Sequence, residues 1–185
     1  MEIRTKYSSG FSNQRKRDIG MVSLIICKKV NSKIGIKNPT KMDYIIHTDG
    51  AYSRMHNEGA FAYVICDGND KEIKRRAWKI SNETNNRAEL KAIIAGLHNL
   101  PANAKKVIVI SDSMYALNTC SGNWSRNANT DLFDIHDKIV MERGLNVSYK
   151  WVKGHNGDYF NEICDQMCND VLGYDANAEF QRYKK

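Results

Sequence analysis

The chain lacks several features that would place it in a membrane or in a disulfide-stabilised class. None of its apolar runs approaches the roughly 18 residues that a membrane helix needs, and the longest, 21–27, is interrupted by Ser23. Proline occurs only twice, and the five cysteines form no C-x-x-C pair. An odd number of cysteines without that spacing favours reduced thiols in a cytosol-like compartment. These absences predict a cytoplasmic protein with no membrane partner.

Acidic residues are scarce in one segment, the first 42 residues. This N-terminal arm, 1–42, has ten Lys and Arg residues against Glu2 and Asp18, a net charge of +8. The whole chain of 185 residues has a net charge of +7, so the remainder carries −1. A basic excess indicates an acidic partner such as nucleic acid. Because the excess is confined to the arm, the function of the remaining residues cannot be inferred from net charge.

The arm permits several interpretations. It is rich in Ser, Asn, Lys and Arg, so we expect it to be largely disordered, with one short strand-like piece at 22–27. It could bind nucleic acid, solubilise the chain, precede an internal start at Met21 or Met42, or serve as an organelle transit peptide. The chain length fits one domain, which we place at 43–173, followed by a C-terminal tail at 174–185.

Residues 43–173 have the pattern of an α/β domain. We expect strands at 44–48, 60–66, 71–80, 107–110 and 147–152, and helices at 86–100, 113–120, 130–143 and 161–172. Three strands in an antiparallel meander, followed by β-α-β crossovers, predict a mixed sheet covered by helices.

Four acidic residues lie where chemistry is often placed. Asp49 and Asp112 follow the first and fourth strands, with a turn expected at Asp49-Gly50. Glu89 and Asp165 fall in the first turns of two helices. If the two strands are parallel neighbours, Asp49 and Asp112 meet at one edge of the sheet. Close carboxylates repel one another, and Mg²⁺, which prefers oxygen ligands, compensates such charge. Two ions roughly 4 Å apart can stabilise the attacking water and the leaving oxygen in phosphodiester cleavage.

These patterns alone leave alternatives open. An Asp after a strand is often a turn residue, and a Glu in the first turn of a helix is favoured by the helix dipole. A zinc site would require His155 with Cys164 or Cys168, although their spacing is unlike that of known zinc sites. Residue types and spacing therefore do not separate a nuclease from a kinase-like or purely structural protein.

Four segments together resemble the ribonuclease H type 1 family. They are 48–52 (TDGAY), 84–90 (TNNRAEL), 111–115 (SDSMY) and 151–157 (WVKGHNG), the last continuing to Asn161-Glu162-x-x-Asp165. They occur in the order of that family and span about 43–173. The resemblance implies a ribonuclease H-like fold, with a five-stranded mixed sheet of order 3-2-1-4-5 flanked by helices. It also implies endonucleolytic hydrolysis of the RNA strand of RNA–DNA hybrids, leaving 5′-phosphate and 3′-hydroxyl ends.

The resemblance further implies roles for individual residues. Asp49 would bridge two Mg²⁺ ions, for which Mn²⁺ could substitute. Asp165 would complete the site of the ion that activates the water, and Glu89 and Asp112 would hold the ion at the leaving oxygen. His155 matches a mobile-loop histidine that assists proton transfer or product release. Positions that match hybrid contacts of the family are Thr84, Asn85, Asn86, Met114, Tyr115, Trp124 and Asn129.

Some residues depart from the family pattern. The stretch 52–59 replaces a glycine-rich segment of many relatives, and Asn82 stands where an Arg often lines a phosphate pocket. Residues 125–130 leave no room for the basic protrusion with which many bacterial relatives grip the hybrid. We hypothesise that the basic arm supplies this grip instead.

Purely structural explanations and other functions remain beside this one. Core packing alone would explain Tyr115 and Trp124, and a helix cap would explain Asn129. The chain could be a nuclease of the same superfamily that acts on another nucleic acid, or a catalytically silent hybrid-binding module. No heptad seam or long apolar stripe is present, so we expect a monomer.

Overall fold

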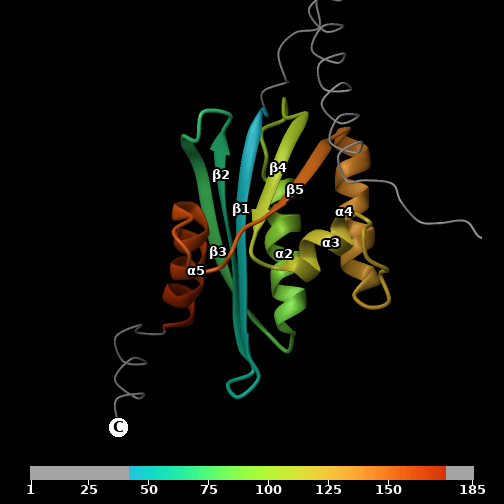
Figure 1. Cartoon of the computed structure of the whole chain (residues 1–185). Helices are drawn as coiled ribbons and strands as arrows, with labels where there is room; N and C mark the ends of the chain where they lie inside the picture. The colour runs from blue at the N-terminus through green and yellow to red at the C-terminus, as the bar shows by residue number, and fades with distance from the viewer. Residues whose placement is uncertain (1–41, 174–185) are drawn as a thin grey trace, which may run out of the picture. The chain divides into compact units, whose positions relative to one another are not determined.

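The computed structural model describes residues 42–173 (Figure 1). The predictions for the N-terminal arm, except at Met42, and for the tail at 174–185 lie outside the described residues.

The described residues form a five-stranded mixed sheet with order β3-β2-β1-β4-β5, as predicted. Its strands are β1 (Tyr44–Ser53), β2 (Glu58–Asp67), β3 (Glu72–Ser81), β4 (Lys106–Ser111) and β5 (Asn146–Trp151). Its helices are α2 (Asn85–His98), α3 (Met114–Cys120), α4 (Thr130–Arg143) and α5 (Tyr159–Leu172). Strands β1 to β3 pair antiparallel, whereas β4 is parallel to both β1 and β5.

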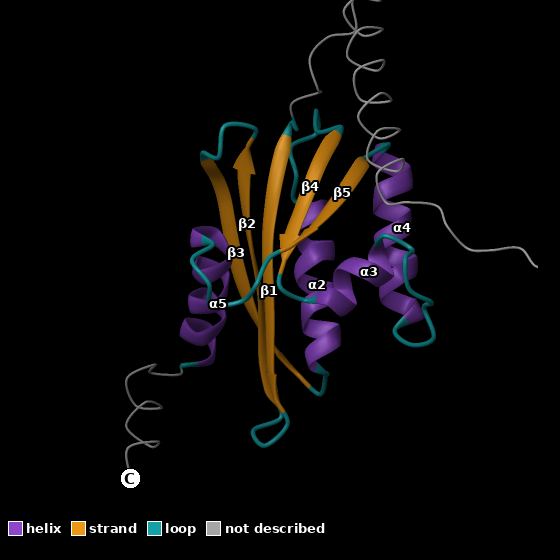
Figure 2. Cartoon of the chain, in the orientation of Figure 1, coloured by secondary structure: helices purple, strands orange, loops and turns teal. Residues whose placement is uncertain are grey.

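Helices cover both faces of the sheet (Figure 2). Helices α2, α3 and α4 lie on one face over a core that includes Ile46, Tyr63 and Leu97. Helix α5 lies on the other face, over a smaller core that includes Val64 and Cys164. Successive residues of a strand point to opposite faces, so β2 contributes to both cores. The central strands are therefore buried, and close packing fixes the positions of the side chains on them.

Strand β1 is longer than predicted. We expected it to end at Thr48, with a turn at Asp49-Gly50, and this is wrong. The strand continues to Ser53, and Asp49 pairs with Ala62 of β2. A Cβ on Gly50 would lie 2.4 Å from the main-chain nitrogen of Glu89. Gly50 is thus needed where α2 crosses the strand, and it does not mark a turn.

Two helices begin earlier than predicted, which moves their acidic residues. Helix α2 begins at Asn85 after the cap Thr84, and α5 begins at Tyr159 after the cap Asp158. Glu89 and Asp165 therefore lie in the second turns of their helices, and their predicted first-turn positions are wrong. The caps explain the earlier starts, because the side chains of Thr84 and Asp158 accept hydrogen bonds from main-chain N–H groups.

The predicted absence of disulfides is confirmed for the described cysteines. Cys66, Cys120, Cys164 and Cys168 are buried free thiols. Among residues 42–173, no helix is both long and apolar enough to cross a membrane.

Candidate active site

Three carboxylates converge at the middle of the sheet. Asp49 lies within β1, Asp112 directly follows β4, and Glu89 faces them from α2. One oxygen from each of the three lies within 4.8 Å of the others. We call these three residues the carboxylate trio. The parallel pairing of β1 with β4 and the close approach of α2 at Gly50 bring them together, as the sequence predicted for Asp49 and Asp112.

Asp165 lies beside the trio without joining it. Its charge raises the pKa of Asp49, after burial and Asp112. One of its oxygens accepts a hydrogen bond from Nδ2 of Asn169 at 3.4 Å. The other lies 3.8 Å from Nδ1 of His155, whose side chain is 79% exposed. The predicted fourth carboxylate and the predicted histidine therefore lie together at the edge of the trio.

Burial and mutual repulsion disfavour the charged forms of the carboxylates in the trio. Burial, followed by the charges of Asp112 and Asp165, raises the pKa of Asp49 to about 7. Burial, followed by Asp49 and Asp112, raises the pKa of Glu89 well above its ordinary value. Oε2 of Glu89 is buried and has no hydrogen-bond partner among residues 42–173. A proton or a cation must compensate such a group, and a set of carboxylate oxygens suits a hard divalent cation.

The main chain of Asp112 is held by the neighbouring strand. The indole N–H of Trp151, the last residue of β5, donates to the main-chain oxygen of Asp112 at 2.9 Å. The N–H of Val152 donates to the main-chain oxygen of Ser111 at 3.0 Å. This role of Trp151 could not be predicted from the sequence, because a hydrogen bond from a side chain to a distant main-chain oxygen leaves no local pattern.

The zinc alternative has no support in the described residues. Cys164 and Cys168 are fully buried, and their thiols donate to the main-chain oxygens of His47 at 3.4 Å and Asp49 at 3.7 Å. His155 is exposed on the loop before α5. Within residues 42–173 the trio is the only group of three or more His, Cys, Asp or Glu side chains close enough to share a metal ion.

The predicted substrate positions form two groups, one at the start of α2 and one on and after α3. Thr84, Asn85 and Asn86 are exposed at the start of α2, while Met114, Tyr115, Trp124 and Asn129 lie on α3 or between α3 and α4. Met114 is 51% and Trp124 46% exposed, so both present apolar surface to solvent. Tyr115 is half-buried and packs against the larger core, which fits the packing interpretation as well.

Asn129 lies at the N-cap of α4, as the cap interpretation predicted, but its side chain does not cap the helix. The residue occupies the cap position with a left-handed φ of 58° and makes no side-chain capping bond. Its Nδ2 donates instead to the hydroxyl of Tyr115 at 2.9 Å. Its Oδ1 accepts from Nη1 of Arg87 at 3.4 Å. The side chain thus joins Tyr115 of the second group to Arg87 of α2, the residue that follows the first group.

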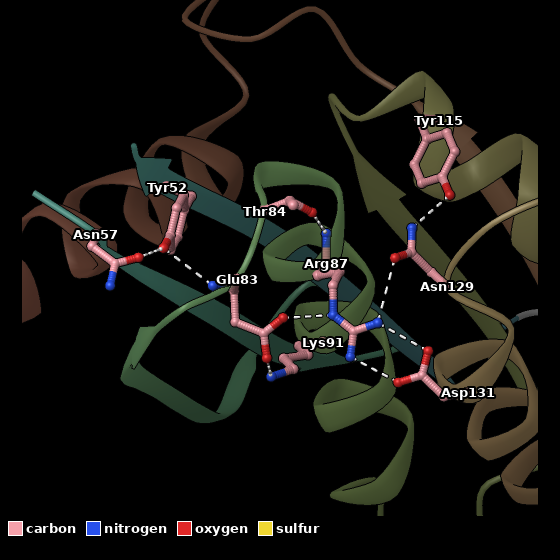
Figure 3. A network of polar contacts seen from close by, with 9 residues as sticks. All are labelled: Tyr52, Asn57, Glu83, Thr84, Arg87, Lys91, Tyr115, Asn129 and Asp131. Atoms are coloured by element: carbon pink, nitrogen blue, oxygen red, sulfur yellow. Dashed lines mark hydrogen bonds and ion pairs between the residues drawn. The ribbon is translucent and has the colours of Figure 1, made fainter. Parts of the chain in front are cut away.

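Arg87 is the centre of a polar network that was not predicted from the sequence (Figure 3). Its Nε donates to Glu83 at 2.5 Å, and its two terminal nitrogens donate to Asp131 at 2.9 and 2.7 Å. Lys91 pairs with the same Glu83. Spacing of four residues from Glu83 to Arg87 and on to Lys91 could have indicated part of this network. Asp131 is distant in the sequence and gave no signal.

Comparison with known proteins identifies the family. The family model for RNase H matches residues 41–172. The ribonuclease H of Pseudomonas fluorescens is 35% identical over 148 residues, covering 70% of this chain and 94% of that protein. The ribonuclease H of Syntrophomonas wolfei is 34% identical over 145 residues, covering 70% of this chain and 96% of that protein.

Solved structures share the fold. The N-terminal RNase H domain of a Mycobacterium tuberculosis protein matches with a TM-score of 0.62 and 22% identity, covering 74% of this chain and 97% of that chain. LC11 ribonuclease H1, solved in complex with an RNA/DNA hybrid, matches with a TM-score of 0.59 and 23% identity, covering 70% and 99%. Because the family model spans most of the chain and relatives match over nearly their whole length, this chain belongs to the ribonuclease H family.

Proposed function

We propose that this protein is an endoribonuclease that hydrolyses the RNA strand of RNA–DNA hybrids and leaves 5′-phosphate and 3′-hydroxyl ends. The observation that carries the proposal is the convergence of Asp49, Glu89 and Asp112 within 4.8 Å in a chain of the ribonuclease H family. A related structure in complex with an RNA/DNA hybrid supports the choice of substrate.

The trio and Asp165 fit two Mg²⁺ ions, with Mn²⁺ as a substitute. Asp49, Glu89 and Asp112 would hold one ion, and Asp49 and Asp165 would hold the other. The raised pKa of Asp49 and the unpartnered Oε2 of Glu89 support a cation at this position. When bound, the ions supply charge neutralisation, a more acidic bound water and stabilisation of the leaving oxygen.

The chain itself holds these groups and provides a route for protons. The trio is fixed on β1, the end of β4 and α2, which limits the movement of its oxygens. His155 is exposed beside Asp165, at the boundary between the carboxylates and solvent. We propose that it transfers a proton or assists release of the product, since a histidine ring can both donate and accept a proton.

The two groups of exposed polar and aromatic residues are proposed to bind the two strands. The amides of Asn85 and Asn86 can donate and accept hydrogen bonds, as recognition of 2′-hydroxyl groups in the minor groove requires. Met114, Tyr115 and Trp124 would lie along the DNA strand. Thr84 and Asn129 would bind one of its phosphates. The protein would act as a monomer in the cytoplasm.

Cleavage of a labelled hybrid tests the proposal. With Mg²⁺ or Mn²⁺, the parent chain should cut the RNA strand, leave the DNA strand intact and produce 5′-phosphate ends. Asp49→Asn should abolish cleavage, whereas Asp134→Asn, which changes an exposed acid on α4, should not. A parent chain that binds the hybrid but never cuts it would support a silent binding module. Cleavage of DNA junctions or single strands alone would support another substrate in the same superfamily.

A further inference from the structure

Two turns beside the proposed hybrid-binding residues are joined by their side chains. Asn57 ends the turn between β1 and β2, and Asn82 begins the connection from β3 to α2. Both have a left-handed backbone, with φ of 52° and 56°, a conformation that Asn tolerates better than most residues. Nδ2 of Asn57 donates to Oδ1 of Asn82 at 2.7 Å. The two turns are therefore linked by a direct side-chain hydrogen bond.

Tyr52 completes this link from strand β1 (Figure 3). Its hydroxyl donates to Oδ1 of Asn57 at 2.5 Å and accepts from the main-chain N–H of Glu83 at 3.1 Å. Its ring lies against Gly59, its partner on β2, where an added Cβ would be 2.5 Å from Cδ2 of the ring. The hydroxyl thus uses both its donor and an acceptor position to join one hairpin to the segment that enters α2.

Glu83 links the hydroxyl of Tyr52 to helix α2. Its carboxylate accepts from Nε of Arg87 at 2.5 Å and pairs with Lys91. Burial alone would raise the pKa of Glu83, but the hydrogen bonds from Lys91 and Arg87 outweigh it and lower the pKa. The carboxylate is therefore charged at neutral pH, and the connection extends from the hairpin into the first two turns of α2.

We infer that Tyr52, Asn57 and Asn82 form a positioning clamp that holds the start of α2 in the orientation that binds the hybrid. Asn85 and Asn86, the proposed contacts to the hybrid, follow the held segment directly and are exposed. Within the part of the chain that the structure describes, the side-chain hydrogen bonds of the clamp residues lead to the turns and to Glu83, and not to the carboxylate trio. This inference rests on the proposed function, because it concerns binding of the same substrate.

The location of the clamp predicts which property it controls. Loss of the clamp should weaken binding of the hybrid, because the first turn of α2 becomes less well oriented. The rate of the chemical step should change little, because the trio is held by β1, β4 and the crossing of α2 at Gly50. A purely structural role would lower stability without a separate effect on KM.

Tyr52→Phe removes the hydroxyl and keeps the ring against Gly59. We expect KM, and the Kd for the hybrid measured with EDTA to prevent cleavage, to rise about 3- to 10-fold, as loss of one or two hydrogen bonds predicts. We expect kcat to stay within about twofold. Tyr44→Phe is the matched control, since Tyr44 lies at the other end of β1 and its hydroxyl donates to Asn103 at 3.1 Å. This control should bind the hybrid like the parent.

Two further measurements separate a clamp from a general loss of stability. Hydrogen exchange of the Glu83 amide should accelerate in Tyr52→Phe and not in Tyr44→Phe, because the hydroxyl of Tyr52 accepts from that N–H. Asn57→Gly keeps a residue that adopts a left-handed backbone but removes the amide. It should raise KM to a similar extent, and the double variant Tyr52→Phe/Asn57→Gly should add little, because both changes break one connection.

The inference is overturned if Tyr52→Phe binds the hybrid as tightly as Tyr44→Phe, or if its kcat falls while KM is unchanged. Failure of the proposed function looks different, because the parent chain would then not cleave the hybrid at all. A parent chain that cleaves the hybrid, together with an unchanged KM in Tyr52→Phe, contradicts the clamp alone.

Discussion

Gly154 lies directly against the carboxylate of Asp112: a Cβ added to this glycine would be 2.4 Å from Oδ2 of Asp112. Trp151, three residues earlier, donates to the main-chain oxygen of the same Asp112. The end of β5 and the loop that follows it therefore fix both the main chain and the side chain of one member of the trio. Glycine is required at 154 because the loop approaches so closely.

Gly154→Ala should reduce cleavage strongly without unfolding the protein. The added methyl group must displace the Asp112 carboxylate or the loop, and a displacement of about 1 Å at a catalytic group can cost on the order of 100-fold in rate. The prediction is a fall in kcat of about 10- to 100-fold, measured on a labelled hybrid. Asn156→Ala, at an exposed position of the same loop, is the control. Equal activity of both variants would contradict the role assigned to this contact.

The stability of the metal-free protein should fall as pH rises through the titration of Asp49. Burial, Asp112 and Asp165 raise the pKa of Asp49 from 3.8 to about 7. Between these values the native state holds a proton that the unfolded chain has released, so raising the pH favours unfolding. Above the native-state pKa of about 7, Asp49 is charged in both states, and the loss of folding free energy that it causes no longer increases with pH.

Asp49→Asn should therefore stabilise the metal-free protein at pH 8 by on the order of 2–4 kcal/mol, from about 1.4 kcal/mol for each unit of pKa. At pH 4 the difference should nearly vanish, because Asp49 is then protonated in the native state. Urea unfolding with EDTA at both pH values measures this. Excess Mg²⁺ should reduce the difference by stabilising only the parent chain. An equal difference at both pH values would show that the charge of Asp49 is not its cause.

The four described cysteines should be unreactive in the native protein. Burial raises the pKa of Cys66 and of Cys120 to about 12, and burial also raises the pKa of Cys164 and Cys168. The thiolate is the reactive form, so Ellman's reagent should find almost none at pH 8. Removing Cys27, outside the described residues, by Cys27→Ser leaves the other thiols as the only targets. In guanidinium all four should react at once, and rapid labelling without denaturant would contradict their burial.

Local sequence patterns predicted the elements of the fold and the placement of two carboxylates of the trio. The apolar runs and the switch from strand to helix spacing predicted five strands and four helices, whereas the sheet order, in which β4 lies parallel beside β1, was implied by the family resemblance. Asp112 follows β4 as expected. Side chains at the end of a strand or the start of a helix can be predicted in this way, because the residues that define these ends are neighbours in the sequence.

The parts that were missed depend on contacts between distant segments. Gly50 looked like a turn because its need for close packing against α2 is visible only in three dimensions. Tyr52 and Asn57 looked like the loss of a glycine-rich segment, whereas they bond to Glu83 and Asn82 across two turns. Asn129 holds the predicted cap position, but the partners of its side chain, Arg87 and Tyr115, are not predictable from its neighbours.

The charge distribution leads to the last prediction, which concerns the basic arm. Residues 1–42 carry a net charge of +8 in a chain of +7, so the domain that holds the trio has no net positive charge of its own to attract a polyanion. If the arm contacts the hybrid, each phosphate that it neutralises should steepen the dependence of log affinity on log salt by about 0.7 to 0.9.

We expect a steeper salt dependence for the full chain than for a version that starts at Met42, with binding measured in EDTA over a range of salt. A full-length variant with Arg15, Lys16 and Arg17 changed to Gln controls for the length of the arm, and its slope should fall between the two. The kcat of the shortened version should match that of the full chain, because the carboxylates lie outside the arm. Equal slopes for all three proteins would mean that the arm does not bind the hybrid, and the domain would then have to grip it through local contacts alone.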